Sequence, residues 1–203
     1  TPGIGLIFYT WTAPDGTVFE ELVDGGSFDW LITNIQTSGS GTYTLVLEAD
    51  NGCFSDTAFV EVTVNPSPVI ENLTGDMTFC EGTNEDILLT GTNSTTGINE
   101  ITYTWEGPGG VLISETTTDI DGPFEYIINT NDAASGTYTL TLVSDLGCSD
   151  SESVTITINE QPEITDITPD TSVCMFSDLV LSGADGNTTS TDDVSYTWTG
   201  PNG

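Results

Sequence analysis

The stretch Tyr9-Thr10-Trp11-Thr12-Ala13-Pro14-Asp15-Gly16 ends an apolar-alternating run, and its pattern occurs three times in this chain of 203 residues. Tyr-Thr-Trp-x-x-Pro-x-Gly returns at residues 103–110 and 196–203. The three tryptophans lie 94 (105 − 11) and 93 (198 − 105) residues apart. Because a repeat of this length is one whole domain, we expect a tandem array of a single domain type.

Other landmarks keep the same period from end to end. Ser-Gly-Thr-Tyr-Thr-Leu at residues 40–45 returns at residues 135–140, and Gly52-Cys53 returns as Gly147-Cys148. The linker-like segments Asn-Pro-Ser-Pro and Asn-Glu-Gln-Pro begin at Asn65 and Asn159. The repeat unit therefore runs from one linker to the next.

Short apolar-alternating runs separated by Gly, Asn, Asp and Pro turns fill residues 66–159, and no helical period occurs there. Seven strands are expected, the first of them broken, at residues 69–80, 87–90, 101–105, 111–114, 124–128, 138–142 and 154–158. This spacing predicts an all-β fold, a tandem array of immunoglobulin-like β-sandwich repeats of about 94 residues.

The phase of the repeat divides the chain into three parts. Residues 1–65 are expected to form the C-terminal part of a repeat, strands C to G, and residues 66–159 a complete repeat. Residues 160–203 are expected to form the N-terminal part of a third, strands A to C. We therefore expect an internal segment of a longer filament.

Five aromatic residues are predicted to form the structural core. A Trp on strand C and a Tyr early in strand F are typical of immunoglobulin-like sandwiches, where the Tyr hydroxyl bonds the backbone upstream. The residues concerned are Trp11, Trp105, Trp198, Tyr43 and Tyr138. Leu45 and Leu140 stand where antibody domains carry a Cys of the inter-sheet disulfide.

Four cysteines recurring at fixed phases suggest an oxidising compartment. We predict a disulfide between Cys80 and Cys148 within the complete repeat, which requires Cys80 to lie on an inner strand beside the start of strand G. The alternative pair across repeats, Cys53 with Cys80, is less favourable because the intervening strands run away from Cys53. Cys53 and Cys174 are then unpaired within residues 1–203.

The sequence contains no Lys, Arg or His against 32 Asp and Glu, giving a formal charge of −32. Nucleic acids and anionic membranes bind proteins through Lys and Arg, so neither is expected as a partner. No run of about 20 apolar residues is present, so no membrane insertion is expected. The partners should be cations or basic surfaces.

This inventory argues against catalysis. Without His, Lys or Arg there is no Ser-His or Cys-His pair, no Schiff base and no arginine clamp. Pairs of carboxylates could hydrolyse a glycoside, but no spacing marks out one pair among 32 acids. The chain is predicted not to be an enzyme.

Calcium is the one candidate cofactor, because hard oxygen ligands suit it. The candidate ligands are Asp119 and Asp121 in a loop, and Glu160, Glu163 and Asp166 at a domain junction. Two further acid clusters lie at residues 48–51 and 192–193. The competing interpretation is that all of these acids are a solvated surface.

Sugar binding and glycosylation are further candidates. Trp30 is the one Trp outside the repeated strand, and its phase favours the core over an exposed sugar platform. Asn-x-Thr sequons for N-glycosylation begin at Asn72, Asn93 and Asn187. Such motifs arise easily in a Thr-rich sequence and are weak evidence for glycans.

The series Cys80-Glu81-Gly82, Tyr-Thr-Trp with Pro-x-Gly, Gly-Thr-Tyr-Thr-Leu and Gly-Cys resembles the tandem immunoglobulin-like or PKD-like repeats of large Bacteroidetes surface proteins. These include the mobile adhesins of gliding cells, exported by the type IX secretion system. The resemblance covers the whole chain; Cys174-Met175-Phe176 departs from Cys-x-Gly. Asp56-Thr57-Ala58 also looks like the O-glycosylation acceptor of that phylum.

This resemblance implies a non-catalytic, extracellular segment of a cell-surface adhesin stalk, attached to the outer membrane. Its partners would be neighbouring repeats, surface anchoring or secretion proteins, and extracellular glycans. The alternatives are spacer modules of a secreted polysaccharide-degrading enzyme and a sugar-binding or protein-binding module.

Overall fold

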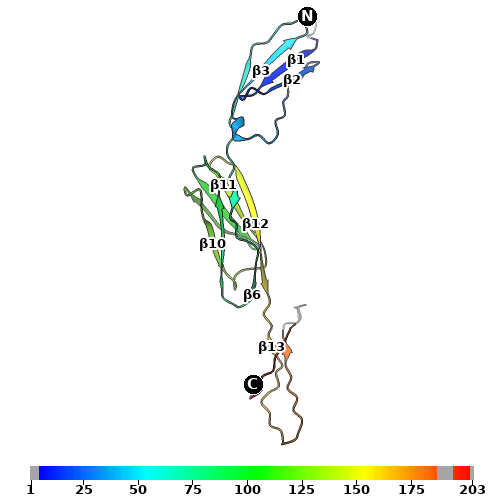
Figure 1. Ribbon diagram of the computed structural model, residues 1–203, viewed down its shortest axis with the longest axis vertical. Helices are drawn as coiled ribbons and strands as arrows, with labels where there is room; N and C mark the ends of the chain where they lie inside the picture. The colour runs from blue at the N-terminus through cyan, green and yellow to red at the C-terminus, as the bar shows by residue number, and fades with distance from the viewer. Residues whose placement is uncertain (1–4, 187–193, 202–203) are drawn as a thin grey trace.

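The computed structural model describes residues 5–186 and 194–201, and its three parts follow one another along the long axis of the molecule (Figure 1). Apart from one 3-10 turn, η1 (Thr37–Gly39), every regular element in these residues is a β-strand. The predicted all-β fold is confirmed.

The first part forms one antiparallel sheet of four strands, in the order β2-β1-β3-β4. The strands are β1 (Ile7–Thr12), β2 (Val18–Val23), β3 (Gly41–Ala49) and β4 (Ala58–Val62). Residues 28–30, which correspond to a strand in the complete repeat, are not a strand here. The reason is that residues 1–65 contain no counterpart of the strand that would pair with them.

The complete repeat is a two-sheet sandwich. One sheet has the order β10-β7-β5 and the other β6-β12-β11-β8-β9. Their strands are β5 (Ile70–Glu71), β6 (Met77–Cys80), β7 (Asp86–Asn93), β8 (Ile101–Gly107), β9 (Gly110–Thr117), β10 (Phe124–Asn129), β11 (Gly136–Ser144) and β12 (Ser149–Asn159). This is the strand order of an immunoglobulin-like sandwich.

The broken first strand changes sheets within the complete repeat. β5 pairs antiparallel with β7, whereas β6 pairs parallel with β12, the last strand. In the parallel pair Cys80 lies opposite Asn159. The end of β6 is thereby fixed at the linker that follows the repeat.

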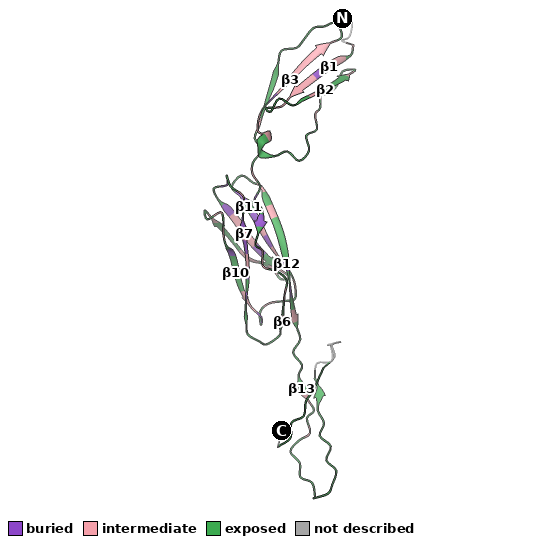
Figure 2. Ribbon diagram, viewed as in Figure 1, coloured by how far each residue is buried: buried purple, intermediate pink, exposed green. Residues whose placement is uncertain are grey.

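The largest cluster of buried side chains lies between the two sheets of residues 70–158, and in the first part Tyr9 and Tyr43 are also buried (Figure 2). Trp105 on β8 is fully buried, and its indole Nε1 donates a hydrogen bond to the Phe124 carbonyl at 3.1 Å. In the first part, Trp11 Nε1 likewise donates to the Phe28 carbonyl at 2.8 Å. The repeated Trp therefore joins strand C to the equivalent Phe of the two repeats, Phe124 at the start of β10 and Phe28 in the first part.

The two strand F tyrosines fix the turns that precede their strands. Tyr138 donates a hydrogen bond from its hydroxyl to the Ala134 carbonyl at 2.9 Å, and Tyr43 does the same to the Gly39 carbonyl at 2.9 Å. Both side chains are buried. The tyrosine corner is thus present in both repeats.

Replacing Tyr138 by Phe should remove this bond and leave the Ala134 carbonyl with one partner fewer. We expect the free energy of unfolding of the complete repeat to fall by about 1 kcal/mol, the usual net worth of such a bond. Urea unfolding measures the change. Tyr103→Phe, on β8, is the control because its hydroxyl bonds the Glu115 side chain at an exposed position, and an equal loss in both variants would contradict the role of the corner.

The third part reproduces only the first steps of the sandwich. β13 (Ile164–Thr165) pairs with β14 (Ala184–Asp185) as β5 pairs with β7. Glu163 N donates to Asp185 Oδ1 at 3.2 Å, the counterpart of the bond from Val69 N to Asn93 Oδ1 at 3.0 Å. The pairing of strands A and B is therefore already formed in the third part.

Trp198 was expected to be a core residue, but its side chain is 50% exposed. Residues 160–203 contain counterparts of strands A to C and none of the strands that cover Trp105 in the complete repeat. The indole of Trp198 is therefore only partly covered, whereas that of Trp105 is fully buried.

Candidate functional site

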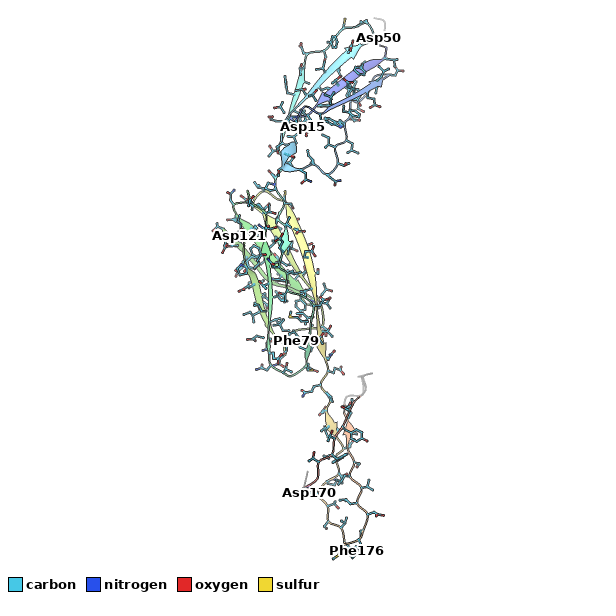
Figure 3. The ribbon with its side chains drawn as sticks, viewed as in Figure 1. Asp15, Asp50, Phe79, Asp121, Asp170 and Phe176 are labelled. Atoms are coloured by element: carbon cyan, nitrogen blue, oxygen red, sulfur yellow. The ribbon has the colours of Figure 1, made fainter. Side chains whose placement is uncertain are left out.

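The acids predicted to bind calcium do not gather. Within residues 5–186 and 194–201, no three His, Cys, Asp or Glu side chains come together in a way that could hold a metal ion. Asp121 and other acids, such as Asp15 and Asp170, lie far apart along the molecule (Figure 3). Residues 192–193 lie outside the described residues.

At the second junction the candidate acids have other partners or positions. Glu163 and Asp185 are joined through the Glu163 amide, and Asp166 has a positive φ of 48° in the turn after β13. Glu160 lies in the linker after β12. The described geometry therefore supplies no cage of oxygen ligands for the predicted calcium.

Local hydrogen bonds tune a few titratable groups. The side-chain hydrogen bond from Asn99 lowers the pKa of Asp145, and the backbone hydrogen bond from Thr17 lowers that of Asp15. The hydrogen bond that Tyr9 donates to Glu21 raises the pKa of Tyr9 to about 12. Each of these pKa shifts follows from a hydrogen bond to a neighbouring group.

The uncompensated charge should make stability depend strongly on salt. Because no side chain of this chain is cationic, the 32 acids repel one another, and compaction increases that repulsion. Raising NaCl from about 0.01 M to about 1 M shortens the Debye length from about 30 Å to about 3 Å. We expect the Tm of the chain to rise by at least about 5 °C, since about 1 kcal/mol moves the Tm of such a domain by 4–8 °C.

Differential scanning calorimetry across this salt series measures the shift. Sucrose at matched osmolality is the control for effects that do not depend on charge. A Tm that stays constant with salt would show that repulsion between the acids does not limit stability.

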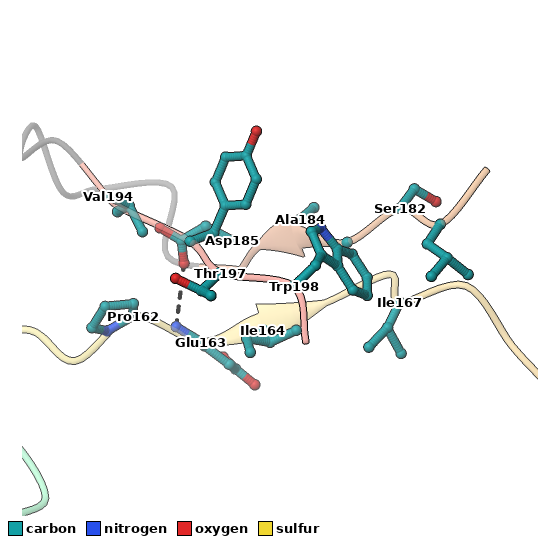
Figure 4. Close-up of a pocket in the computed structure, with 13 residues that line it drawn as sticks. Pro162, Glu163, Ile164, Ile167, Ser182, Ala184, Asp185, Val194, Thr197 and Trp198 are labelled. Atoms are coloured by element: carbon teal, nitrogen blue, oxygen red, sulfur yellow. Dashed lines mark hydrogen bonds between the residues drawn. The ribbon is translucent and has the colours of Figure 1, made fainter. Parts of the chain in front are cut away.

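A hollow of about 640 Å³ lies in the third part (Figure 4). Its apolar lining includes Ile164, Ile167 and Trp198, and Ile164 and Trp198 correspond to the core residues Ile70 and Trp105. The hollow therefore occupies the place of the sandwich core, where strands E to G have no counterpart in residues 160–203. By its position the hollow corresponds to the core of the complete repeat.

Trp30 does not form a sugar-binding platform. Its ring stacks on Phe19 with centroids 5.8 Å apart and an interplanar angle of 7°, and it meets Tyr43 edge-on at 6.1 Å. Both partners belong to the sheet of the first part. The structure thus places Trp30 in an aromatic cluster, as its phase indicates.

The sequons differ in accessibility. The Asn93 side chain is buried and hydrogen bonds to Val69 N, Thr95 and the Ile120 carbonyl, so it is closed to a glycan. Asn72 is exposed and donates to Thr92 Oγ1. Asn187 lies outside the described residues.

The junction between the first two parts is held by side-chain hydrogen bonds from the linker. Asn65 Nδ2 donates to the Leu146 carbonyl at 3.3 Å, and Ser67 Oγ donates to the Ser149 carbonyl at 3.1 Å. Pro68, two residues before β5, is fully buried. The linker is therefore fastened to the F–G turn of the repeat that follows it.

The predicted bridge between Cys80 and Cys148 is not formed, and all four thiols are free. Cys80 lies opposite Asn159 at the end of β12, whereas Cys148 immediately precedes Ser149 at its beginning. The 11 residues of β12 separate the two cysteines by about 35 Å at the usual rise per residue. The prediction is corrected: Cys80 does lie beside strand G, but at its far end.

Sequence reasoning treated the linkers only as domain boundaries and missed the contacts of Asn65. The available signal was the recurrence of Asn at the same phase of the repeat, at residues 65 and 159, and of Gly-Cys in the F–G turn. What no local pattern shows is that these two features touch.

No family model matches the sequence, and no curated protein matches it. Solved structures with a distant likeness include Dpr11 IG1 bound to DIP-gamma IG+IG2, with 17% identity, a TM-score of 0.35 and coverage of 77% of this chain and 86% of that one. Titin domains I67–I69 have 16% identity, a TM-score of 0.35 and coverage of 77% and 56%. The fibronectin(III)-like modules of Clostridium thermocellum CbhA have 17% identity, a TM-score of 0.34 and coverage of 79% and 82%.

The strand order of residues 70–159 by itself shows an immunoglobulin-like β-sandwich, and the repeat period shows that such modules follow one another in the chain. None of the described residues forms a helix with the length and apolarity needed to span a bilayer.

Proposed function

We propose that this chain is a non-catalytic spacer segment of an extracellular stalk, built from one module repeated end to end. The observation that carries the proposal is the linker at residues 65–68, which is hydrogen bonded to the module after it. A linker fastened in this way limits bending between modules, so that successive repeats add length.

The acidic surface agrees with this role. A chain with 32 acids and no cationic side chain repels other copies of itself and stays extended and soluble. With no Lys or Arg it also offers no cleavage site to trypsin-like proteases. Both properties suit a filament exposed outside the cell.

The resemblance of the repeat motifs to those of Bacteroidetes surface proteins supports a finer proposal. The stalk would be part of a cell-surface adhesin of the gliding type, exported by type IX secretion and attached at the outer membrane. Its partners would be neighbouring repeats, anchoring or secretion proteins, and extracellular glycans bound by other parts of the molecule.

The stalk proposal is tested by adding a repeat. A chain of residues 1–159 followed by residues 66–203 contains one more complete repeat and joins the copies through the natural sequence Asn-Pro-Ser-Pro. β12 alone spans about 35 Å, so the maximum dimension in small-angle X-ray scattering should grow by at least about that amount.

Replacing residues 65–68 with Gly-Ser-Gly-Ser provides the control for junction stiffness, and it should broaden the distribution of interatomic distances. A lengthened chain with an unchanged maximum dimension would show that repeats fold back on one another. For the location, antibodies against residues 66–159 should label intact cells, and labelling only after permeabilisation would refute a surface stalk.

A further inference from the structure

Asn65 and Asn159 occupy the same position in two successive repeats. Each directly follows a residue whose amide is bonded to a serine: Val64 N donates to Ser40 Oγ at 2.9 Å, and Ile158 N donates to Ser135 Oγ at 2.8 Å. Asn65 and Asn159 lie 94 (159 − 65) residues apart, the same separation as that of Cys80 and Cys174 (174 − 80). What surrounds one asparagine therefore shows what surrounds the other in a longer array.

The first junction shows a cysteine of the following repeat at this position. Cys148 Sγ lies 3.8 Å from the Asn65 carbonyl oxygen, and the Asn65 side chain reaches the same F–G turn at Leu146. The thiol in the F–G turn thus faces the end of strand G of the repeat before it.

The second junction shows a cysteine of the preceding repeat at the equivalent position. Cys80 is the parallel register partner of Asn159, and Glu81 N donates to the Asn159 carbonyl oxygen at 2.8 Å. Register partners in a parallel pair lie about 4.8 Å apart and point to the same face of the sheet. Cys80 therefore points to the face on which the asparagine side chain meets the next F–G turn.

We propose that consecutive repeats are joined by a disulfide between the Cys80 position of one repeat and the Cys148 position of the next. Both cysteines converge on one carbonyl, that of the linker asparagine. The proposed bridge would require the Cα atoms of the two cysteines to lie 4.4–6.8 Å apart. The partner of Cys80 would lie in the F–G turn of the repeat after it, and the partner of Cys148 before strand B of the repeat before it. Residues 1–203 contain neither of these positions, which agrees with the four free thiols.

The oxidation transfers two electrons and two protons from the two thiols to an external disulfide. A small-molecule disulfide such as oxidised glutathione, or the active-site disulfide of an oxidoreductase, is reduced to two thiols as the new S–S bond forms. Cys80 is exposed and Cys148 is half-buried, so one thiol is accessible to start the exchange. The bridge would clamp every junction of the array covalently.

The experiment compares the chain of 203 residues with the lengthened chain of residues 1–159 followed by 66–203. After equilibration with reduced and oxidised glutathione, free thiols are alkylated, and peptides made with a protease that cleaves after Glu are mapped without reduction. We expect one linked pair of peptides containing Cys80 and Cys148 in the lengthened chain, and none in the original chain.

Two matched variants identify which copies are joined. Cys80→Ser in the first copy should abolish the linked pair, whereas Cys80→Ser in the second copy should leave it unchanged. Six free thiols in the lengthened chain, a linked pair in the original chain, or loss of the pair only with the second substitution would each overturn the proposal. The stalk proposal is tested separately, because the lengthened chain can be extended with all of its thiols reduced.

Discussion

Replacing Trp105 by Ala is expected to lower the free energy of unfolding of the complete repeat by about 3–5 kcal/mol, as for other large aromatic residues removed from a core. The indole is fully buried between the two sheets, so the substitution leaves a cavity bordered by both. It also removes the donor to the Phe124 carbonyl, which lies on the edge of the opposite sheet. A loss of this size is a large part of the 5–15 kcal/mol that stabilises a typical domain.

Urea unfolding followed by circular dichroism gives the midpoint, and hydrogen exchange of the β8 and β11 amides assigns the change to this repeat. Trp198→Ala is the matched control, since it removes the same residue from the same motif where the side chain is half exposed. We expect the control to change stability by no more than about 0.5 kcal/mol. If both variants lost the same free energy of unfolding, the stabilisation by this Trp would not depend on its burial in a completed sandwich.

Most strands of the complete repeat could be predicted because apolar residues alternate along them. Strand β9 is the instructive exception, since the sequence indicates a short strand at 111–114 and the structure extends it from Gly110 to Thr117. Its additional pairing is polar: the Thr102 hydroxyl on β8 is hydrogen bonded to the Thr116 hydroxyl, and the Tyr103 hydroxyl donates to Glu115. Hydroxyl pairs on a solvent face carry no hydrophobic period and are missed by a search for one.

The cysteines could not be placed from sequence for a different reason. The position of Cys80 depends on the parallel pairing of β6 with the distant strand β12, a contact between segments nearly a whole repeat apart. Sequence spacing shows that two cysteines recur but not which end of the sandwich each one occupies. The contact of Leu140 could not be predicted from sequence spacing either. Leu140 replaces the antibody cysteine, and its side chain lies against Gly91 on the facing sheet.

Gly136→Ala is expected to destabilise the complete repeat by about 2–6 kcal/mol, because it disturbs the contact between Gly136 of the strand F motif and Pro108 of the Trp-x-x-Pro-x-Gly turn. Gly136 has a φ of 149°, a region that side chains other than Gly adopt at a cost of about 1–3 kcal/mol. A Cβ there would lie 2.6 Å from Pro108 Cγ of the Trp-x-x-Pro-x-Gly turn, and overpacking costs about 1–3 kcal/mol more. Gly41 faces Pro14 in the same way in the first part.

The two contributions can be separated by urea unfolding of a double variant. Pro108→Ala combined with Gly136→Ala should recover the steric part of the loss but not the part due to φ, giving a coupling energy of about 1–2 kcal/mol. Gly109→Ala is the control, because a Cβ at Gly109 meets nothing within 4 Å. If Gly136→Ala were as stable as Gly109→Ala, or if Pro108→Ala restored nothing, the proline and the glycine would not be coupled. Their recurrence together, at residues 14 and 41 and again at 108 and 136, would then need a cause other than packing.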